Sequence, residues 1–200
     1  SGVDAGAIVN LFPASGGGDE ETLEQARERV PQTLKSRDRA VSVEDFELHA
    51  RAAGGIARAK ALPLSHPQFP GVEVPGVVSV IVVPDARDDQ DDAPMPTEGT
   101  LRQVCAYLDA RRLATVELYV VSPHYRQITV SAELVCRDDA DLAAVKQAAL
   151  VGLNRYFHPL QGGADGTGWP FGDDIYYSLV LQRLLVAGVK RVAKLEIGLD

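Results

Sequence analysis

The chain has 200 residues, of which 46% are hydrophobic and 24% are charged, a composition typical of folded globular proteins. Acidic side chains outnumber basic ones by 28 to 20, so the formal net charge of −8 does not provide the positive surface that nucleic-acid binding requires. No apolar run is long enough for a transmembrane helix, and the start lacks the basic and apolar regions of a signal peptide. We therefore expect a sizeable core and no contact with nucleic acid or membrane.

Residues 1–55 are expected to form an N-terminal subdomain made of a strand, a loop and helices. A glycine-rich stretch near its start leads into a charged helical segment at residues 20–29. Ser42 and Asp45 have the spacing of a capping box, in which each side chain bonds the other residue's backbone N–H. This spacing predicts a helix over residues 43–53.

From residue 56 onward the apolar residues alternate with a period of two, which predicts strands. A nearly unbroken β-branched run at residues 77–83 is typical of a central strand, and an amphipathic helix is expected at residues 101–112. The stretches 116–120 and 128–136 both alternate cleanly on either side of a short turn, and we expect them to form a hairpin.

Two further helices, at residues 138–157 and 175–187, and a last strand at residues 193–199 complete the pattern. The predicted fold is therefore α+β, with a ferredoxin-like βαββαβ domain over residues 56–200. An inserted glycine-rich loop, residues 159–174, and one extra helix would interrupt this domain, and the small helical N-terminal subdomain would precede it.

The glycine-rich loop contains the sequence PLQGGADGTGWPFG, which raises the question of a nucleotide site. Phosphate-binding loops join a strand to a helix, whereas this segment follows a helix and lacks a Gly-Lys-Ser/Thr ending. Trp169 and Phe171 instead supply large apolar area on a segment too long for a simple turn. The loop either packs on its own core or contacts a neighbouring protein, and the sequence leaves both alternatives open.

No coherent set of catalytic or metal-binding residues is evident. The four histidines show none of the spacings of zinc sites, and no GxSxG motif is present. The acidic loop at residues 85–92 lacks the central glycine and final glutamate of a calcium hand, which leaves weak calcium binding as a lesser alternative. Cys105 and Cys136 continue apolar faces and are expected in the core. We therefore expect no enzymatic activity, no cofactor and no bound metal.

Four stretches together resemble the baseplate J-like family, the wedge proteins of contractile phage tails and related injection systems. They are NLFPASGGGDEETLEQARERVPQTLKSRDRAVSVEDFE at residues 10–47, IARAKALP at 56–63, PGVVSVIVVP at 75–84 and PLQGGADGTGWPFGDDIYYSLV at 159–180. The string RDRAVSVEDFE is similar to the family signature RAVT-x-EDY, with Ser42 in place of Thr and Phe46 in place of Tyr. The serine keeps the cap, and the phenylalanine removes a hydroxyl.

The resemblance implies a non-enzymatic wedge component that corresponds to the C-terminal portion of longer proteins and links the central spike and tube hub to the sheath. Its implied partners are other wedge subunits, identical or homologous, together with sheath-initiator or inner-baseplate proteins and the hub itself. Such a protein would be assembled in the bacterial cytoplasm into a phage or phage-tail-like particle. A ferredoxin-like small-molecule-binding domain or enzyme subunit remains the alternative, because a fold does not fix a function.

Seven residues are candidates for interfaces with these partners, either as aromatic anchors, as parts of the glycine-rich loop or as parts of the family signature. They are Trp169, Phe171, Gly163, Asp165, Gly166, Arg39 and Phe46.

Overall fold

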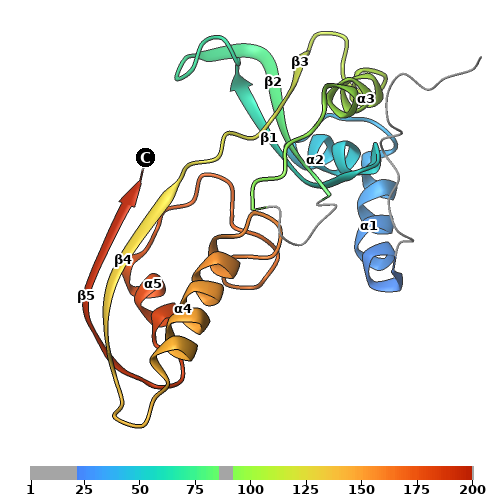
Figure 1. Cartoon of the computed structure of the whole chain (residues 1–200). Helices are drawn as coiled ribbons and strands as arrows, with labels where there is room; N and C mark the ends of the chain where they lie inside the picture. Colours follow the sequence, from blue (N-terminus) through green and yellow to red (C-terminus); the bar gives the residue numbers. More distant parts are fainter. Residues whose placement is uncertain (1–21, 86–91, 200) are drawn as a thin grey trace, which may run out of the picture. The chain divides into compact units, whose positions relative to one another are not determined.

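The computed structural model describes residues 22–85 and 92–199, which belong to two compact units (Figure 1). The first unit comprises the described residues up to Asp85 together with Met95–Pro123, and the second comprises those from His124 onward with a short segment ending at Pro94. The fold is α+β, as expected. The division falls after Pro123, whereas the sequence suggested a boundary at residue 55, because the helix before residue 55 packs on the strand that follows it.

The first unit contains three helices and three strands among its described residues. In chain order they are α1 (Leu23–Ser36), α2 (Val43–Ala52), β1 (Ile56–Ser65), β2 (Glu73–Pro84), α3 (Glu98–Asp109) and β3 (Glu117–Val121). The strands form a sheet in the order β1-β2-β3, in which β1 and β2 are antiparallel and β2 and β3 are parallel. Helix α3 therefore makes the crossover of a βαβ unit, as parallel neighbouring strands require.

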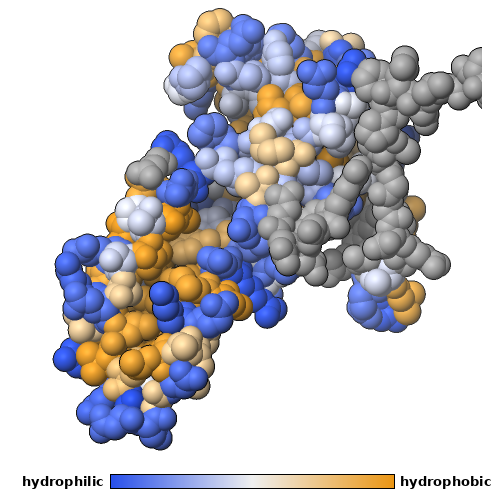
Figure 2. Space-filling model, viewed as in Figure 1, coloured by the Kyte–Doolittle hydropathy of each residue, from blue (hydrophilic) through white to orange (hydrophobic). Residues whose placement is uncertain are grey.

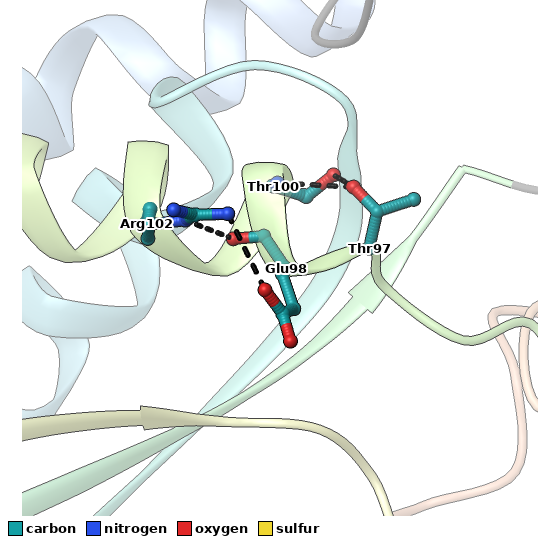
Figure 3. Close-up of polar contacts among 4 residues, drawn as sticks. All are labelled: Thr97, Glu98, Thr100 and Arg102. Atoms are coloured by element: carbon teal, nitrogen blue, oxygen red, sulfur yellow. Dashed lines mark hydrogen bonds and ion pairs between the residues drawn. The ribbon is translucent and has the colours of Figure 1, made fainter. Parts of the chain in front are cut away.

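Local sequence explains where two of these helices begin. Ser42 and Asp45 form the predicted capping box at the start of α2, with the Asp45 N–H donating to Ser42 Oγ over 3.2 Å. Thr97 caps α3 by accepting the Thr100 N–H over 3.1 Å, and Arg102 pairs with Glu98 one turn earlier (Figure 3). The two cap bonds satisfy backbone N–H groups that have no partner within the helix.

A continuous apolar core joins α2, α3 and the sheet of the first unit. Phe46 is 2% exposed, and Val80, Val104 and Leu108 are fully buried beside it in the same cluster. The β-branched run of β2 thus lies in the middle of the sheet, as its sequence predicted.

The second unit contains two helices and two strands among its described residues. They are β4 (Ile128–Cys136), α4 (Leu142–Phe157), α5 (Tyr177–Leu184) and β5 (Val189–Leu199). β4 and β5 form an antiparallel pair, and their alternating apolar residues pack with both helices around Leu153, Val180 and Leu195. Figure 2 shows further hydrophobic residues gathered on the visible face of this unit.

The expected hairpin between residues 116–120 and 128–136 is wrong, and the described residues do not form the single βαββαβ sheet. β3 pairs in parallel with β2 of the first unit, whereas β4 pairs with β5. The segment between β3 and β4 crosses from one unit to the other instead of turning back. Alternation identified the inward face of each strand, but it carries no information about which strand lies alongside.

The predicted last helix is present but shorter than expected, and two predicted segments lie outside the described residues. Helix α5 spans Tyr177–Leu184 and is shorter than the predicted 175–187, because Tyr176 has an extended backbone and Leu185 leaves the helical conformation. The predicted first strand near residues 7–11 and most of the acidic loop at residues 85–92 lie outside the described residues.

Candidate functional site

The glycine-rich loop is held by backbone hydrogen bonds to the end of α4. The N–H of Gly163 donates to the Tyr156 carbonyl over 2.8 Å, and the N–H of Gly162 donates to the His158 carbonyl over 2.9 Å. The N–H of Trp169 reaches the same His158 carbonyl over 3.1 Å. The loop therefore folds back onto the helix that precedes it, which gives it a defined conformation.

Steric crowding explains why two adjacent positions of this loop, 162 and 163, are glycine. A Cβ at Gly162 would collide with the carbonyl oxygens of Tyr156 and His158, because the loop backbone lies directly against the helix end. Gly163 has φ +79, a left-handed conformation that side chains disfavour, and a Cβ there would lie 3.0 Å from the Gly168 carbonyl oxygen. Gly162 and Gly163 thus allow the loop backbone to pack closely on the helix end and on itself.

Trp169 packs on aromatic rings of its own unit. Its ring lies 5.2 Å from that of Tyr156 in an edge-on arrangement and 5.1 Å from that of Phe157 in a tilted one. Both partners belong to the last turn of α4, and Trp169 contacts the buried cluster of the second unit. Of the two alternatives for the loop, self-packing therefore accounts for Trp169, which is half-buried.

The remaining loop candidates differ in exposure. Asp165 and Gly166 are exposed near the end of the loop, where Asp165 accepts a hydrogen bond from the Thr167 hydroxyl over 3.0 Å. Phe171 is half-buried. Of these loop candidates, only Asp165 and Gly166 are exposed, and neither is aromatic.

The two signature candidates lie close in sequence but in different environments. Phe46 belongs to the core of the first unit, so its side chain is not available to a partner. Arg39 is exposed and follows Arg37 and Asp38, whose φ values of 50 and 59 are left-handed. This turn places Asp38 2.7 Å from the guanidinium of Arg111.

The signature segment has an architectural role in this unit. Ala40, which is fully buried, donates its N–H to the Arg111 carbonyl over 3.0 Å and forms a parallel bridge with Arg112. The segment thereby ties the start of α2 to the end of α3.

The capping carboxylate of Asp45 has a shifted pKa. Burial raises the pKa of Asp45, but hydrogen bonds from the N–H groups of Ser42 and Val41 and from the Ser42 hydroxyl outweigh this effect. The pKa of Asp45 therefore lies below its ordinary value of 3.8.

An exposed apolar tip on the β1–β2 hairpin was not predicted. We define the hairpin tip as residues 64–72; it exposes 39% of Leu64, 54% of Phe69 and 58% of Val72. Leu64 lies at a register shift in β1 and has φ 61, which is unusual for a bulky residue. The proline-rich sequence of this stretch indicated only a connection; the signal that could have been used is Phe69 itself, a large apolar residue between two prolines.

Polar contacts hold the hairpin tip on the sheet. The N–H of Gln68 donates to His66 Nδ1 over 3.1 Å, and His66 Nε2 lies 3.0 Å from the hydroxyl of Tyr119 on β3. Tyr119 in turn donates to Glu117, and this bond raises the pKa of the phenol. The ring of His66 also lies 4.8 Å from that of Phe69. The exposed side chains are therefore presented by an ordered support.

No arrangement of the described residues points to catalysis. Residues 22–85 and 92–199 contain no cluster of histidine, cysteine and carboxylate side chains that could hold a metal ion. Asp173 and Asp174 precede α5 but do not cap it, because no side chain accepts a hydrogen bond at the start of this helix. Asp173 instead accepts the N–H of Asp174 over 3.0 Å. Within the same described ranges, no helix is both long and apolar enough to cross a membrane.

A comparison with protein families matches the part of the first unit that follows α1. Residues 38–121 match the model of the Baseplate J-like central domain, a range that begins at the Asp38–Arg111 contact and ends with β3. No curated protein matches the chain.

Among solved structures, the chain is similar to a chain in the cryo-EM structure of the anti-feeding prophage baseplate, symmetrised sixfold. The similarity has a TM-score of 0.63 at 18% sequence identity and covers 89% of this chain but 38% of that one. At this identity the similarity concerns the fold. The family match thus identifies residues 38–121 as a Baseplate J-like central domain, and the fold over most of the chain is similar to that of a chain in this baseplate.

Proposed function

We propose that the chain is a structural wedge component of the baseplate of a contractile injection system or phage tail. In this role it links the central spike and tube hub to the sheath through contacts with other wedge subunits and inner-baseplate proteins. The observation that carries the proposal is the match of residues 38–121 to the Baseplate J-like central domain, which covers α2, α3 and the whole β1-β2-β3 sheet of the first unit. It acts by holding neighbours in place and not by chemistry.

The hairpin tip is the surface that best suits such contacts. Its exposed side chains lie on one connection that, in Figure 1, extends beyond the helices of its own unit. Large apolar side chains that are exposed on an ordered support lose little conformational entropy on binding. We assign Phe69 and Val72 as contact residues of the first unit, with Arg39 as a further exposed candidate.

The glycine-rich loop is a second candidate contact in this proposal. Asp165 and Gly166 are exposed, and Asp165 offers a carboxylate to a partner. Trp169 and Phe171 are half-buried and would support the conformation of the loop. Gly163 has the left-handed backbone, φ +79, that the turn before these residues requires. Their contribution to an interface would be indirect and would depend on the loop keeping its shape.

The hairpin tip can be tested by a double variant, Phe69→Ser with Val72→Ser, in the protein expressed together with its baseplate neighbours. We expect the variant to fold, because both side chains are more than half exposed, but to lose co-purification of at least one neighbour. Leu113→Ser is a matched control in the same unit, since Leu113 is 46% exposed and lies away from the tip in sequence. Equal co-purification of both variants and the wild type would remove the tip from the interface.

A further inference from the structure

Two carboxylates border the hairpin tip. Glu73 follows the tip directly on β2 and lies opposite Ser65 in the register with β1. Glu117 on β3 accepts a hydrogen bond from the hydroxyl of Tyr119, and that hydroxyl lies 3.0 Å from Nε2 of His66 in the tip. Both glutamates are exposed. The exposed apolar side chains of the tip are therefore flanked by two negative charges.

No cation balances these two charges in the part of the chain that the structure describes, where no ion pair includes Glu73 or Glu117. Strands β2 and β3 and the tip between β1 and β2 contain no lysine or arginine. The nearest cation to each glutamate along the chain, Lys60 or Arg112, pairs with a different carboxylate. The surface at this end of the hairpin therefore favours a positively charged partner, because like charges repel across an interface.

The backbone of the tip is ordered and, at one residue, strained. The N–H of Phe69 donates to the His66 carbonyl over 3.1 Å, and the N–H of Val72 donates to the Phe69 carbonyl over 3.2 Å. Leu64 is 39% exposed and has φ 61, a conformation that costs free energy for a bulky side chain and occurs most often at functional sites. Strain, apolar exposure and unbalanced charge therefore coincide at one end of the hairpin.

We propose that the hairpin tip binds a segment of a baseplate neighbour that combines apolar side chains with a lysine or arginine. The apolar side chains pack on Leu64, Phe69 and Val72, and the cation pairs with Glu73 and Glu117. Burial of apolar area supplies most of the affinity, whereas exposed ion pairs contribute little and select the sign of the partner's charge. The inference rests on the proposed baseplate function and deepens it by stating the chemistry of the contact.

The test compares variants of the protein expressed together with its baseplate neighbours. Glu73→Gln with Glu117→Gln removes both charges, while glutamine at position 117 keeps an oxygen that can accept the Tyr119 hydroxyl. Glu98→Gln with Glu133→Gln is the matched control, because it changes the net charge equally at two exposed carboxylates on α3 and β4. The amount of each neighbour retained is measured in NaCl from about 0.05 M to about 0.5 M, since salt screens exposed charges. Circular dichroism checks that each variant folds.

We expect the wild type and the control variant to retain a neighbour equally, with retention that falls as salt rises. The Glu73→Gln, Glu117→Gln variant should retain roughly three- to tenfold less at low salt, with a weaker dependence on salt. Charge reversal, Glu73→Lys with Glu117→Lys, should abolish retention at low salt.

Three outcomes overturn the inference while the baseplate function stands: equal retention by the Glu73→Gln, Glu117→Gln variant and the wild type, an equal loss in the control variant, or stronger retention after charge reversal. The last of these would indicate an acidic partner. A wild type that retains no baseplate neighbour at low salt contradicts the proposed function, and the inference fails with it.

Discussion

Replacing Phe46 with alanine tests whether the family signature serves the core or an interface. Phe46 is 2% exposed and contacts a cluster in which Val80, Val104 and Leu108 are fully buried. Removing its ring takes away the transfer free energy of a phenyl group and leaves a cavity that packed neighbours fill only in part. We therefore expect Phe46→Ala to lower the free energy of unfolding by about 3–5 kcal/mol.

The assay is urea unfolding followed by far-UV circular dichroism, with Phe46→Leu as a control that keeps most of the buried volume. We expect Phe46→Leu to cost roughly 1–1.5 kcal/mol, because a hydrophobic replacement of similar size is tolerated better than a truncation. A loss below about 1 kcal/mol for Phe46→Ala, together with weaker binding of a baseplate neighbour, would refute the core assignment.

Three further predictions concern the cap of α2 and the glycine-rich loop. Asp45→Asn should destabilise the protein by about 1 kcal/mol at neutral pH. Because the pKa of Asp45 is lowered in the folded state, its contribution to stability is present above about pH 4 and is lost as the pH falls through the folded-state pKa. The melting temperatures of wild type and Asp45→Asn should therefore converge in acid. A difference in melting temperature that stays the same at every pH would contradict the cap assignment. Gly162→Ala should cost about 2 kcal/mol or more in thermal melts, because its Cβ would meet the carbonyls of Tyr156 and His158, and a neutral effect would show that the loop can move aside. Trp169→Ala should cost about 2–3 kcal/mol in urea unfolding through the lost packing on Tyr156 and Phe157, and a variant of unchanged stability that fails to bind neighbours would instead favour a contact through Trp169.

The local elements were predictable because their signals are short-range. Ser42 and Asp45 predicted a helix over residues 43–53, and α2 spans Val43–Ala52. The alternation at residues 128–136 coincides with the bounds of β4. Caps and side-chain periodicity act within a few residues of the chain, so the sequence carries them directly.

Strand pairing was not predictable by the same route. The alternation at residues 116–120 is compatible with an antiparallel neighbour or a parallel one, and we expected the wrong partner for β3. The order strand, helix, strand over β2, α3 and β3 was the overlooked signal, since a helical crossover favours parallel pairing. Pairing depends on which strands meet in space, which periodicity does not encode.

The candidate site was predicted in part for a similar reason. The order of elements and the missing Gly-Lys-Ser/Thr ending argued against a phosphate site in the glycine-rich loop, but only the structure shows that Gly162 packs against Tyr156 and His158. Phe46 was chosen for its place in the signature, yet position in a motif does not distinguish a buried side chain from an exposed one. The hairpin tip was missed because exposure of Phe69 depends on the whole sheet and not on its neighbours in sequence.

The most direct test of the central claim is an affinity pull-down of the chain from the lysate of its native host, with quantitative mass spectrometry of everything retained. The proposed role predicts sheath, tube or other baseplate proteins in fixed stoichiometry with the chain, and their loss in the Phe69→Ser, Val72→Ser variant would place the contact at the hairpin tip. Recovery of the chain without any of these proteins, and with a bound small molecule instead, would contradict the structural role.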